Sequence, residues 1–361
     1  MKKIITTIFL TISLFAGNYI YVPCSGDKVI RIFKLDEKSG TLTLIDTTKT
    51  DRLAGQAVVS PDGQFLYVGR SEAKRKNPGL ETYMIQANGK LKKMAFSATP
   101  FLAGFMTLDK HGKYLFSSSY RDGNVCMYKL ENGLFKGKVA SVQNTEKSAH
   151  SVILDHSNNF VFVPHTRPNN IYQFQLSNGT LKALEPNAAN GPDTTKNYHA
   201  PRHIVKHPSK NIFYTSNESG GGISSWKLAA NGQLKLWQTF STLPDNADWR
   251  SMAADIKITA NGQFAYVTNR YKGKELPLKD SIASFQIDNE SGRILKRTGI
   301  TPTMPIPSQI AFNKANNYLY LLSSKNMIIS HYSINPKDGT LKKIKDYKPG
   351  LNPTSIVVVN K

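Results

Sequence analysis

The sequence predicts an all-β protein, a seven-bladed β-propeller with four-stranded antiparallel blades. Short runs rich in Val, Ile, Tyr and Phe alternate with glycine turns along the chain, which is typical of β-strands and hairpins. Three local patterns each occur seven times. Their spacing of about 45–55 residues is that of propeller blades. No segment has the apolar period of an amphipathic helix.

The first two patterns are single strands, which we assign to blade positions A and B. Position A, the innermost strand of a propeller blade, is an apolar strand ending in a turn; its copies begin at Ala57, Phe105, Ser151, His203, Asp255, Gln309 and Ser355. Position B is an apolar or aromatic run that follows shortly after; its copies begin at Tyr19, Phe65, Tyr114, Phe160, Ile212, Phe264 and Tyr318.

The third pattern is a hairpin of two strands, C and D, joined by Asn-Gly, Asp-Gly or Ser-Gly. These dipeptides supply the positive φ of tight hairpin turns. The seven glycines are Gly40, Gly89, Gly133, Gly179, Gly232, Gly292 and Gly339.

The two ends of the propeller are expected to complete one blade together. The repeats begin with a B strand at residues 19–22 and end with an A strand at 355–359. Pairing between them closes the ring and removes an open sheet edge. We therefore predict one domain over residues 18–361, with inserts around 185–200 and 271–281 forming loops on a propeller face, where functional residues tend to lie.

Residues 1–17 have the form of a signal peptide, because two lysines precede an apolar run that is too short for a comfortable membrane span. We expect export to the periplasm or the medium, without stable membrane insertion after cleavage; a cytoplasmic location follows if the segment is not a signal. Cys24 and Cys126 are expected to lie two blades apart and to form no disulfide.

The chain carries 47 Lys and Arg against 25 Asp and Glu, a formal charge of +22. Such a surface attracts anions. The lysines are scattered through turns rather than gathered in an arm or a basic helix, so nucleic acid is not expected as a partner. We expect a monomer.

Blade alignment places four polar residues at one mouth of the central channel. An offset of 52 residues equates the B strands of three blades, and the same offset equates two sets of flanking positions: His150, Arg202 and Ala254 before strand A, and Thr166, Glu218 and Arg270 after strand B. Because A and B are antiparallel, the start of A and the end of B lie on the same face. The site is therefore predicted at His150, Arg202, Glu218 and Arg270.

These side chains suit an anionic, oxygen-rich substrate. Arginine binds carboxylate or phosphate and can stabilise the oxyanion formed when water attacks an ester. Either His150 or Glu218 could be the base. A structural reading is also open: Arg202 and Glu218 as an ion pair, His150 as a channel-lining residue and Arg270 as surface charge.

Two further residues, Asp255 and Arg250, are predicted to contact substrate at the same mouth. No metal or cofactor is expected. Residues 203 and 207 share a strand face but lie about 13 Å apart, too far for one ion, so His203 and His207 are expected to be structural.

The chain resembles the seven-bladed propeller lactonases. The resemblance covers residues 18–361 and rests on an ordered set of motifs: Ser-Pro-Asp-Gly-Gln-Phe-Leu-Tyr-Val at 60–68, the turn at 122–125, His150-Ser151, Pro201-Arg202-His203, His207-Pro208, Asn217-Glu218, Arg250 and residues 253–256. That family includes bacterial 6-phosphogluconolactonases and, more distantly, fungal muconate-lactonising enzymes. The resemblance implies a metal-free hydrolase that opens a sugar lactone in carbohydrate metabolism, with His150, Arg202, Glu218 and Arg270 as its polar set.

Two alternatives stay open. One is a cycloisomerase that acts on an unsaturated diacid. The other is a non-catalytic exported propeller that binds an envelope partner, since fold alone does not give function. The predicted export signal also leaves the lactone open, because phosphorylated sugars are cytoplasmic metabolites.

Overall fold

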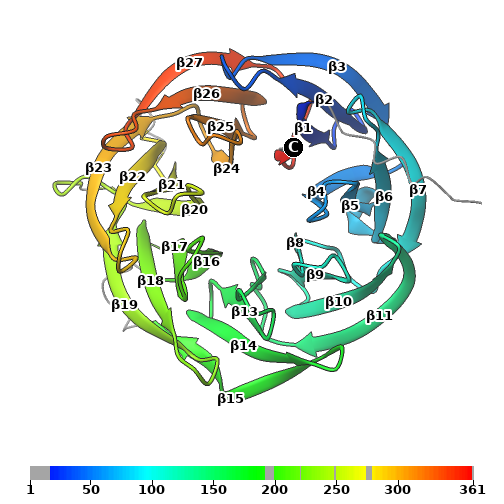
Figure 1. Ribbon diagram of the computed structural model, residues 1–361, viewed down its shortest axis with the longest axis horizontal. Coiled ribbons are helices and arrows are strands. Elements are labelled where there is room, and N and C mark those ends of the chain that lie inside the picture. Colours follow the sequence, from blue (N-terminus) through cyan, green and yellow to red (C-terminus); the bar gives the residue numbers. More distant parts are fainter. Residues whose placement is uncertain (1–16, 192–198, 220, 248, 274–278, 360–361) are drawn as a thin grey trace, which may run out of the picture.

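The computed structural model describes residues 17–191, 199–219, 221–247, 249–273 and 279–359. Seven four-stranded antiparallel sheets stand around a central channel, like the blades of a propeller (Figure 1). The predicted fold class is thus confirmed. The predicted signal segment lies outside the described residues except for Gly17. No helix among the described residues is long and apolar enough to cross a membrane.

The strands of each blade run outward from the channel in the order A, B, C, D. Blade one is β28 (Val357–Val359), β1 (Asn18–Cys24), β2 (Val29–Leu35) and β3 (Leu42–Lys49). Blade two is β4 (Leu53–Val59), β5 (Phe65–Ser71), β6 (Gly79–Ile85) and β7 (Leu91–Ala98), with the short 3₁₀ helix η1 (Ala73–Arg75) after β5. Blade three is β8 (Phe105–Leu108), β9 (Tyr114–Ser119), β10 (Asn124–Glu131) and β11 (Leu134–Asn144).

The other four blades repeat this order. Blade four is β12 (Ile153–Leu154), β13 (Phe160–His165), β14 (Asn170–Ser177) and β15 (Thr180–Asn190). Blade five is β16 (Pro201–Lys206), β17 (Ile212–Asn217), β18 (Gly222–Leu228) and β19 (Leu234–Ser241). Blade six is β20 (Ser251–Ile258), β21 (Phe264–Tyr271), β22 (Ser281–Ile287) and β23 (Ile294–Pro302). Blade seven is β24 (Pro307–Phe312), β25 (Tyr318–Ser323), β26 (Ile328–Ile334) and β27 (Leu341–Tyr347).

The two predicted inserts differ in outcome. Residues 185–190 continue strand β15, with Ala189 opposite Ile171, so the prediction of a loop was wrong for that part of the insert at 185–200. Residues 191, 199 and 200 lie between strands, and residues 192–198 lie outside the described residues. A β-bulge in the β14–β15 pairing lets this outer strand run on. In the second insert, residues 272, 273, 279 and 280 lie between β21, which ends at Tyr271, and β22, which begins at Ser281, as predicted; residues 274–278 lie outside the described residues.

The hairpin glycines join neighbouring blades. All seven have φ between 70° and 86°, the left-handed region in which glycine is favoured. A Cβ on Gly89 would collide with the ring of Tyr19, and one on Gly232 with the ring of Phe160. Each of these rings begins strand B of the preceding blade, so the missing side chain lets the hairpin press against its neighbour.

Tyrosines on strand B hold the same hairpins from the other side. In five blades a Tyr hydroxyl donates a hydrogen bond to the hairpin glycine carbonyl of the next blade: Tyr21 to Gly89 (2.8 Å), Tyr67 to Gly133 (2.8 Å), Tyr266 to Gly339 (2.8 Å), Tyr320 to Gly40 (2.7 Å) and Tyr214 to Gly292. The equivalent residues in blades three and four are Phe116 and Phe162, which carry no hydroxyl.

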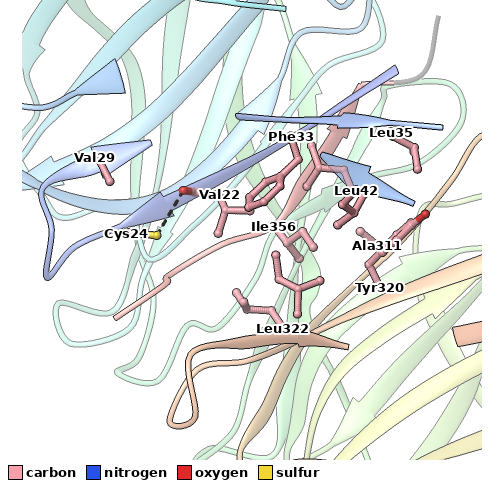
Figure 2. Packing of buried hydrophobic residues seen from close by; sticks show 12 residues of the cluster. Val22, Cys24, Val29, Phe33, Leu35, Leu42, Ala311, Tyr320, Leu322 and Ile356 are labelled. Carbon is pink, nitrogen blue, oxygen red and sulfur yellow. Dashed lines mark hydrogen bonds between the residues drawn. The ribbon is translucent and has the colours of Figure 1, made fainter. Parts of the chain in front are cut away.

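The ring closes as predicted. Strand β28 pairs with β1 in antiparallel register, with Val359 opposite Tyr19. Beneath this joint lies a buried apolar cluster to which both ends of the chain and blade seven contribute (Figure 2). Ile356 occupies its middle, between Val22 and Phe33 on one side and Leu322 on the other (Figure 2). Cys24 belongs to the same cluster, and neither it nor Cys126 forms a disulfide, as expected.

Candidate active site

Strand register brings the four predicted residues to one face. Arg202 lies near the start of β16 and Arg270 near the end of β21. Glu218 follows β17 directly, and its amide donates to Ala200 O at 2.8 Å. His150 precedes β12, where its amide donates to Pro164 O at 3.0 Å. Starts of A strands and ends of B strands therefore meet at the same mouth of the channel.

Glu218 is the centre of the group. Its Oε2 lies 3.4 Å from Arg202 Nε and 3.6 Å from His150 Nε2, and its Oε1 lies 3.4 Å from Arg270 Nη2. The four side chains, which we name the mouth quartet (His150, Arg202, Glu218 and Arg270), are between 13% and 20% exposed. They are mostly buried at the channel mouth, and the exposed part of each side chain can be reached by a small molecule.

The mouth quartet keeps unused hydrogen-bonding capacity. Arg202 Nε, Glu218 Oε2 and Arg270 Nη2 are buried atoms without a hydrogen-bond partner among the described residues. In the interior of blade two, Arg70 and Glu81 meet at a shorter 2.6 Å with almost no exposure, although Arg70 Nη1 also lacks a partner within the described structure. Buried polar atoms are normally satisfied within a fold, and the 3.4 Å contacts of Glu218 with Arg202 and Arg270 are long for hydrogen bonds. These groups can therefore exchange partners with a ligand.

Arg202 is fixed from below by a chain of hydrogen bonds. Its Nη1 donates to Ala254 O at 3.1 Å and to His203 Nε2 at 3.0 Å. His203 Nδ1 lies 2.8 Å from Asp255 Oδ1. A carboxylate can only accept, so Nδ1 carries the hydrogen and Nε2 is free to accept from Arg202. His203 and Asp255 thus orient the arginine.

The two predicted substrate contacts lie apart from the mouth quartet. Asp255 is buried, and its second oxygen accepts from the Ile310 amide at 2.8 Å. Its carboxyl borders a channel cavity of about 390 Å³ with His203. Arg250 is exposed just before β20, and no ion pair or hydrogen bond joins its side chain to the mouth quartet in the described part of the chain. Direct substrate contact by Asp255 and Arg250 stays a prediction.

Burial and charge set the protonation states. Burial, with the neighbouring Arg202, His203 and Arg270, lowers the pKa of His150 well below its usual value, so His150 is neutral at neutral pH. Burial and Arg202 lower the pKa of His203 to about 4. Burial and Arg270 lower the pKa of Arg202 to about 10, which still leaves it charged at neutral pH.

Tyr120 is a fifth residue at this mouth, and sequence reasoning missed it. It follows β9 in blade three, and its ring centroid lies 4.7 Å from that of His150, edge to face. It is close enough to Arg202 and Arg270 to influence the pKa of both. The B-strand alignment does contain the signal: Tyr120 stands six residues after Tyr114, as Glu218 stands six after Ile212.

Asp280 is another residue that sequence reasoning missed. It lies buried just before β22, and its Oδ1 accepts from the Ile306 amide at 3.0 Å. Burial raises its pKa despite the amides and the Arg270 charge nearby.

Within the described residues, no three His, Cys, Asp or Glu side chains are grouped as metal ligands.

Comparison with known proteins gives a consistent result over the whole propeller. Residues 19–358 match the family model "Lactonase, 7-bladed beta-propeller". A 6-phosphogluconolactonase of Buchnera aphidicola subsp. Schizaphis graminum is 28% identical over 339 residues, which cover 92% of this chain and 96% of that protein.

Among solved structures, the Pseudomonas aeruginosa periplasmic gluconolactonase PpgL shares the fold with a TM-score of 0.83 and 18% identity, over 95% of this chain and 99% of that one. A candidate 6-phosphogluconolactonase of Bacteroides fragilis has a TM-score of 0.82 and 19% identity, over 96% and 99%. At these identities the two structures support the fold alone, and the family match supports the kind of enzyme. The chain belongs to the seven-bladed β-propeller lactonases.

Proposed function

We propose that the mouth quartet hydrolyses the ring ester of an anionic or sugar-derived lactone. The observation that carries the proposal is the grouping of His150, Arg202 and Arg270 around Glu218 at 3.4–3.6 Å, with side chains that are 13–20% exposed. The Buchnera relative bears the name of a 6-phosphogluconolactonase and covers nearly the same length, which supports a sugar lactone as the substrate.

The proposed reaction begins with water beside His150 Nε2. The neutral imidazole takes a proton as the water oxygen bonds to the lactone carbonyl carbon, and Glu218, 3.6 Å away, stabilises the imidazolium. N–H groups of Arg202 and Arg270 stabilise the oxyanion. When the intermediate collapses, the ring C–O bond breaks and the departing oxygen takes the proton from His150. The product is the open hydroxy acid, and no cofactor enters the balance.

A substitution at Arg202 tests this assignment. We expect Arg202→Ala to abolish hydrolysis of a panel of aldonolactones, phosphorylated and unphosphorylated, with a loss of at least about 100-fold in kcat/KM, as when an oxyanion donor is removed. Arg293→Ala, an exposed arginine on blade six, is the matched control and should keep wild-type rates. Full activity in Arg202→Ala would sink the proposal.

We further propose that residues 1–17 are removed on export and that residues 18–361 work as a monomeric propeller in the periplasm or the medium, with no nucleic-acid partner and no membrane insertion. The lysine-flanked apolar run supports this, and one fold neighbour is named a periplasmic enzyme. Cell fractionation and N-terminal sequencing of the purified protein test it. A cytoplasmic protein that still begins at Met1 would refute export.

A further inference from the structure

A second hollow opens on the same face, next to the mouth quartet. It is a cavity of about 410 Å³ bounded by the loop after β5, the segment before β8 and the turn after β9. Its lining includes Arg75, Lys76, Phe101, Tyr120 and Arg121. Tyr120 is the shared wall, because its ring also packs against His150.

The cavity is positively charged. Arg75, Lys76 and Arg121 are exposed, and no ion pair or side-chain hydrogen bond is found for them among the described residues. The acid in the lining, Asp122, accepts a short hydrogen bond from the Ser119 hydroxyl. Glu72, at the start of the same loop, pairs instead with Arg52 at 3.0 Å. Three cations therefore face this space against the single carboxylate of Asp122, which leaves a net positive charge in the lining.

Backbone conformation presents two of these cations. Arg75 has a φ of 62°, in the left-handed region that non-glycine residues rarely adopt, and its amide donates to Glu72 O at 3.0 Å. The 3₁₀ turn thereby carries Arg75 and Lys76 to the cavity rim. Phe101 and the Tyr120 ring supply apolar surface on which the carbon skeleton of a ligand can lie.

We propose that this cavity, bounded by Arg75, Lys76, Tyr120 and Arg121, is the subsite for an anionic substituent of the lactone, a phosphate or a carboxylate. The inference rests on the proposed function and deepens it. The two guanidinium groups of the mouth quartet already face Glu218 and are required at the ester carbonyl. An anionic group elsewhere on the substrate needs its own cations, and guanidinium groups bind such oxyanions in pairs of hydrogen bonds.

The test compares three lactones: 6-phosphogluconolactone, glucaro-1,4-lactone with its free carboxylate, and neutral gluconolactone. In the double variant Arg75→Ala/Arg121→Ala we expect the ratio of kcat/KM for an anionic lactone to that for gluconolactone to fall roughly tenfold, mainly through KM. The anionic lactone with the larger fall identifies the substituent. The control Arg293→Ala/Lys235→Ala removes two exposed cations that do not line this cavity and lowers the net charge by the same amount. It should leave the ratio unchanged, because only cations at the cavity contact the anionic substituent.

An unchanged ratio in Arg75→Ala/Arg121→Ala, or the same fall in the control, would overturn the subsite. Binding of 6-phosphogluconate and gluconate, measured by calorimetry, separates this outcome from failure of the proposed function. If the wild type hydrolyses no lactone but binds 6-phosphogluconate more tightly than gluconate, and the variant loses that preference, the subsite stands and the hydrolase mechanism falls. If neither turnover nor a binding preference is found, both fall.

Discussion

Glu218 and Glu81 show how one fold uses the same kind of ion pair in two ways. Glu81 meets Arg70 at 2.6 Å, is nearly fully buried and also accepts from Tyr83. Glu218 meets its guanidinium partners at 3.4 Å, in a partly open wall, and leaves an oxygen unsatisfied. Lys93 pairs with the other Glu81 oxygen at 2.8 Å, so both oxygens of this buried carboxylate have close partners inside a blade. The longer contacts of Glu218, on side chains that are 13–20% exposed, suit a carboxylate that exchanges partners with a ligand.

The acid limb of the reaction tests the role of His150. Its pKa is held below the usual value because burial and nearby cations disfavour the imidazolium. A base must be neutral to act, and a lowered pKa keeps it neutral further into acid. We therefore expect kcat/KM to stay level as pH falls through 6.5, the ordinary histidine pKa, and to drop only well below it. Initial rates from pH 8 to 4 measure this, and an acid limb centred at or above 6.5 would contradict it.

At the scale of strands, His331 on β26 is a buried histidine that packs in the interior of a blade. The ring is buried, stacks on Tyr320 at a centroid distance of 5.1 Å and contacts Tyr318 edge to face. Neither nitrogen has a hydrogen-bond partner in the described structure. Burial lowers its pKa to about 4. Between about pH 6.5 and 4, His331 therefore binds a proton in the unfolded chain and stays neutral in the folded chain.

That difference predicts acid sensitivity that the variant His331→Phe should partly lose. From pH 7 to 5 the unfolded state gains protons at position 331 and the folded state does not, so this residue lowers the free energy of unfolding by roughly 2 kcal/mol over that range. Urea titrations of wild type and His331→Phe at both pH values measure it. The same pH-dependent loss in both proteins would show that His331 is not responsible. Comparing pH differences removes any packing change caused by the new ring.

At the scale of the whole molecule, the ring of blades is closed by its two ends. Strand β28, at the end of the chain, completes the blade that β1 begins. Ile356 buries its side chain beneath that joint (Figure 2). Ile356→Ala should lower the free energy of unfolding by about 2–5 kcal/mol, the cost of emptying a packed site. Leu351→Ala, exposed a few residues earlier, should change it little. Thermal melting compares the two; equal melting temperatures would mean that the joint does not limit stability.

Much of the fold was predictable because its information is periodic. Seven copies of three patterns predict blade number, hairpin glycines and the pairing of both termini, and each was confirmed. The end of strand β15 was not predicted correctly, because a β-bulge shifts its pairing with β14 and no residue pattern in the sequence marks that shift. The placement of the mouth quartet was predicted from a constant offset of 52 residues. Tyr120 was not predicted, because strand B of its blade lies 46 residues, not 52, before strand B of the next blade (Tyr114 to Phe160).

The sequence by itself determined the propeller, its closure and the face on which His150, Arg202, Glu218 and Arg270 gather, because period and antiparallel pairing decide at which end of a strand a residue lies. Only the tertiary structure decided which atoms of these residues meet, which stay unsatisfied, and that His203 and Asp255 orient Arg202 while Tyr120 divides the mouth from a cationic hollow. Those facts depend on contacts between blades, where residues about fifty positions apart pack side by side, and no local pattern records them.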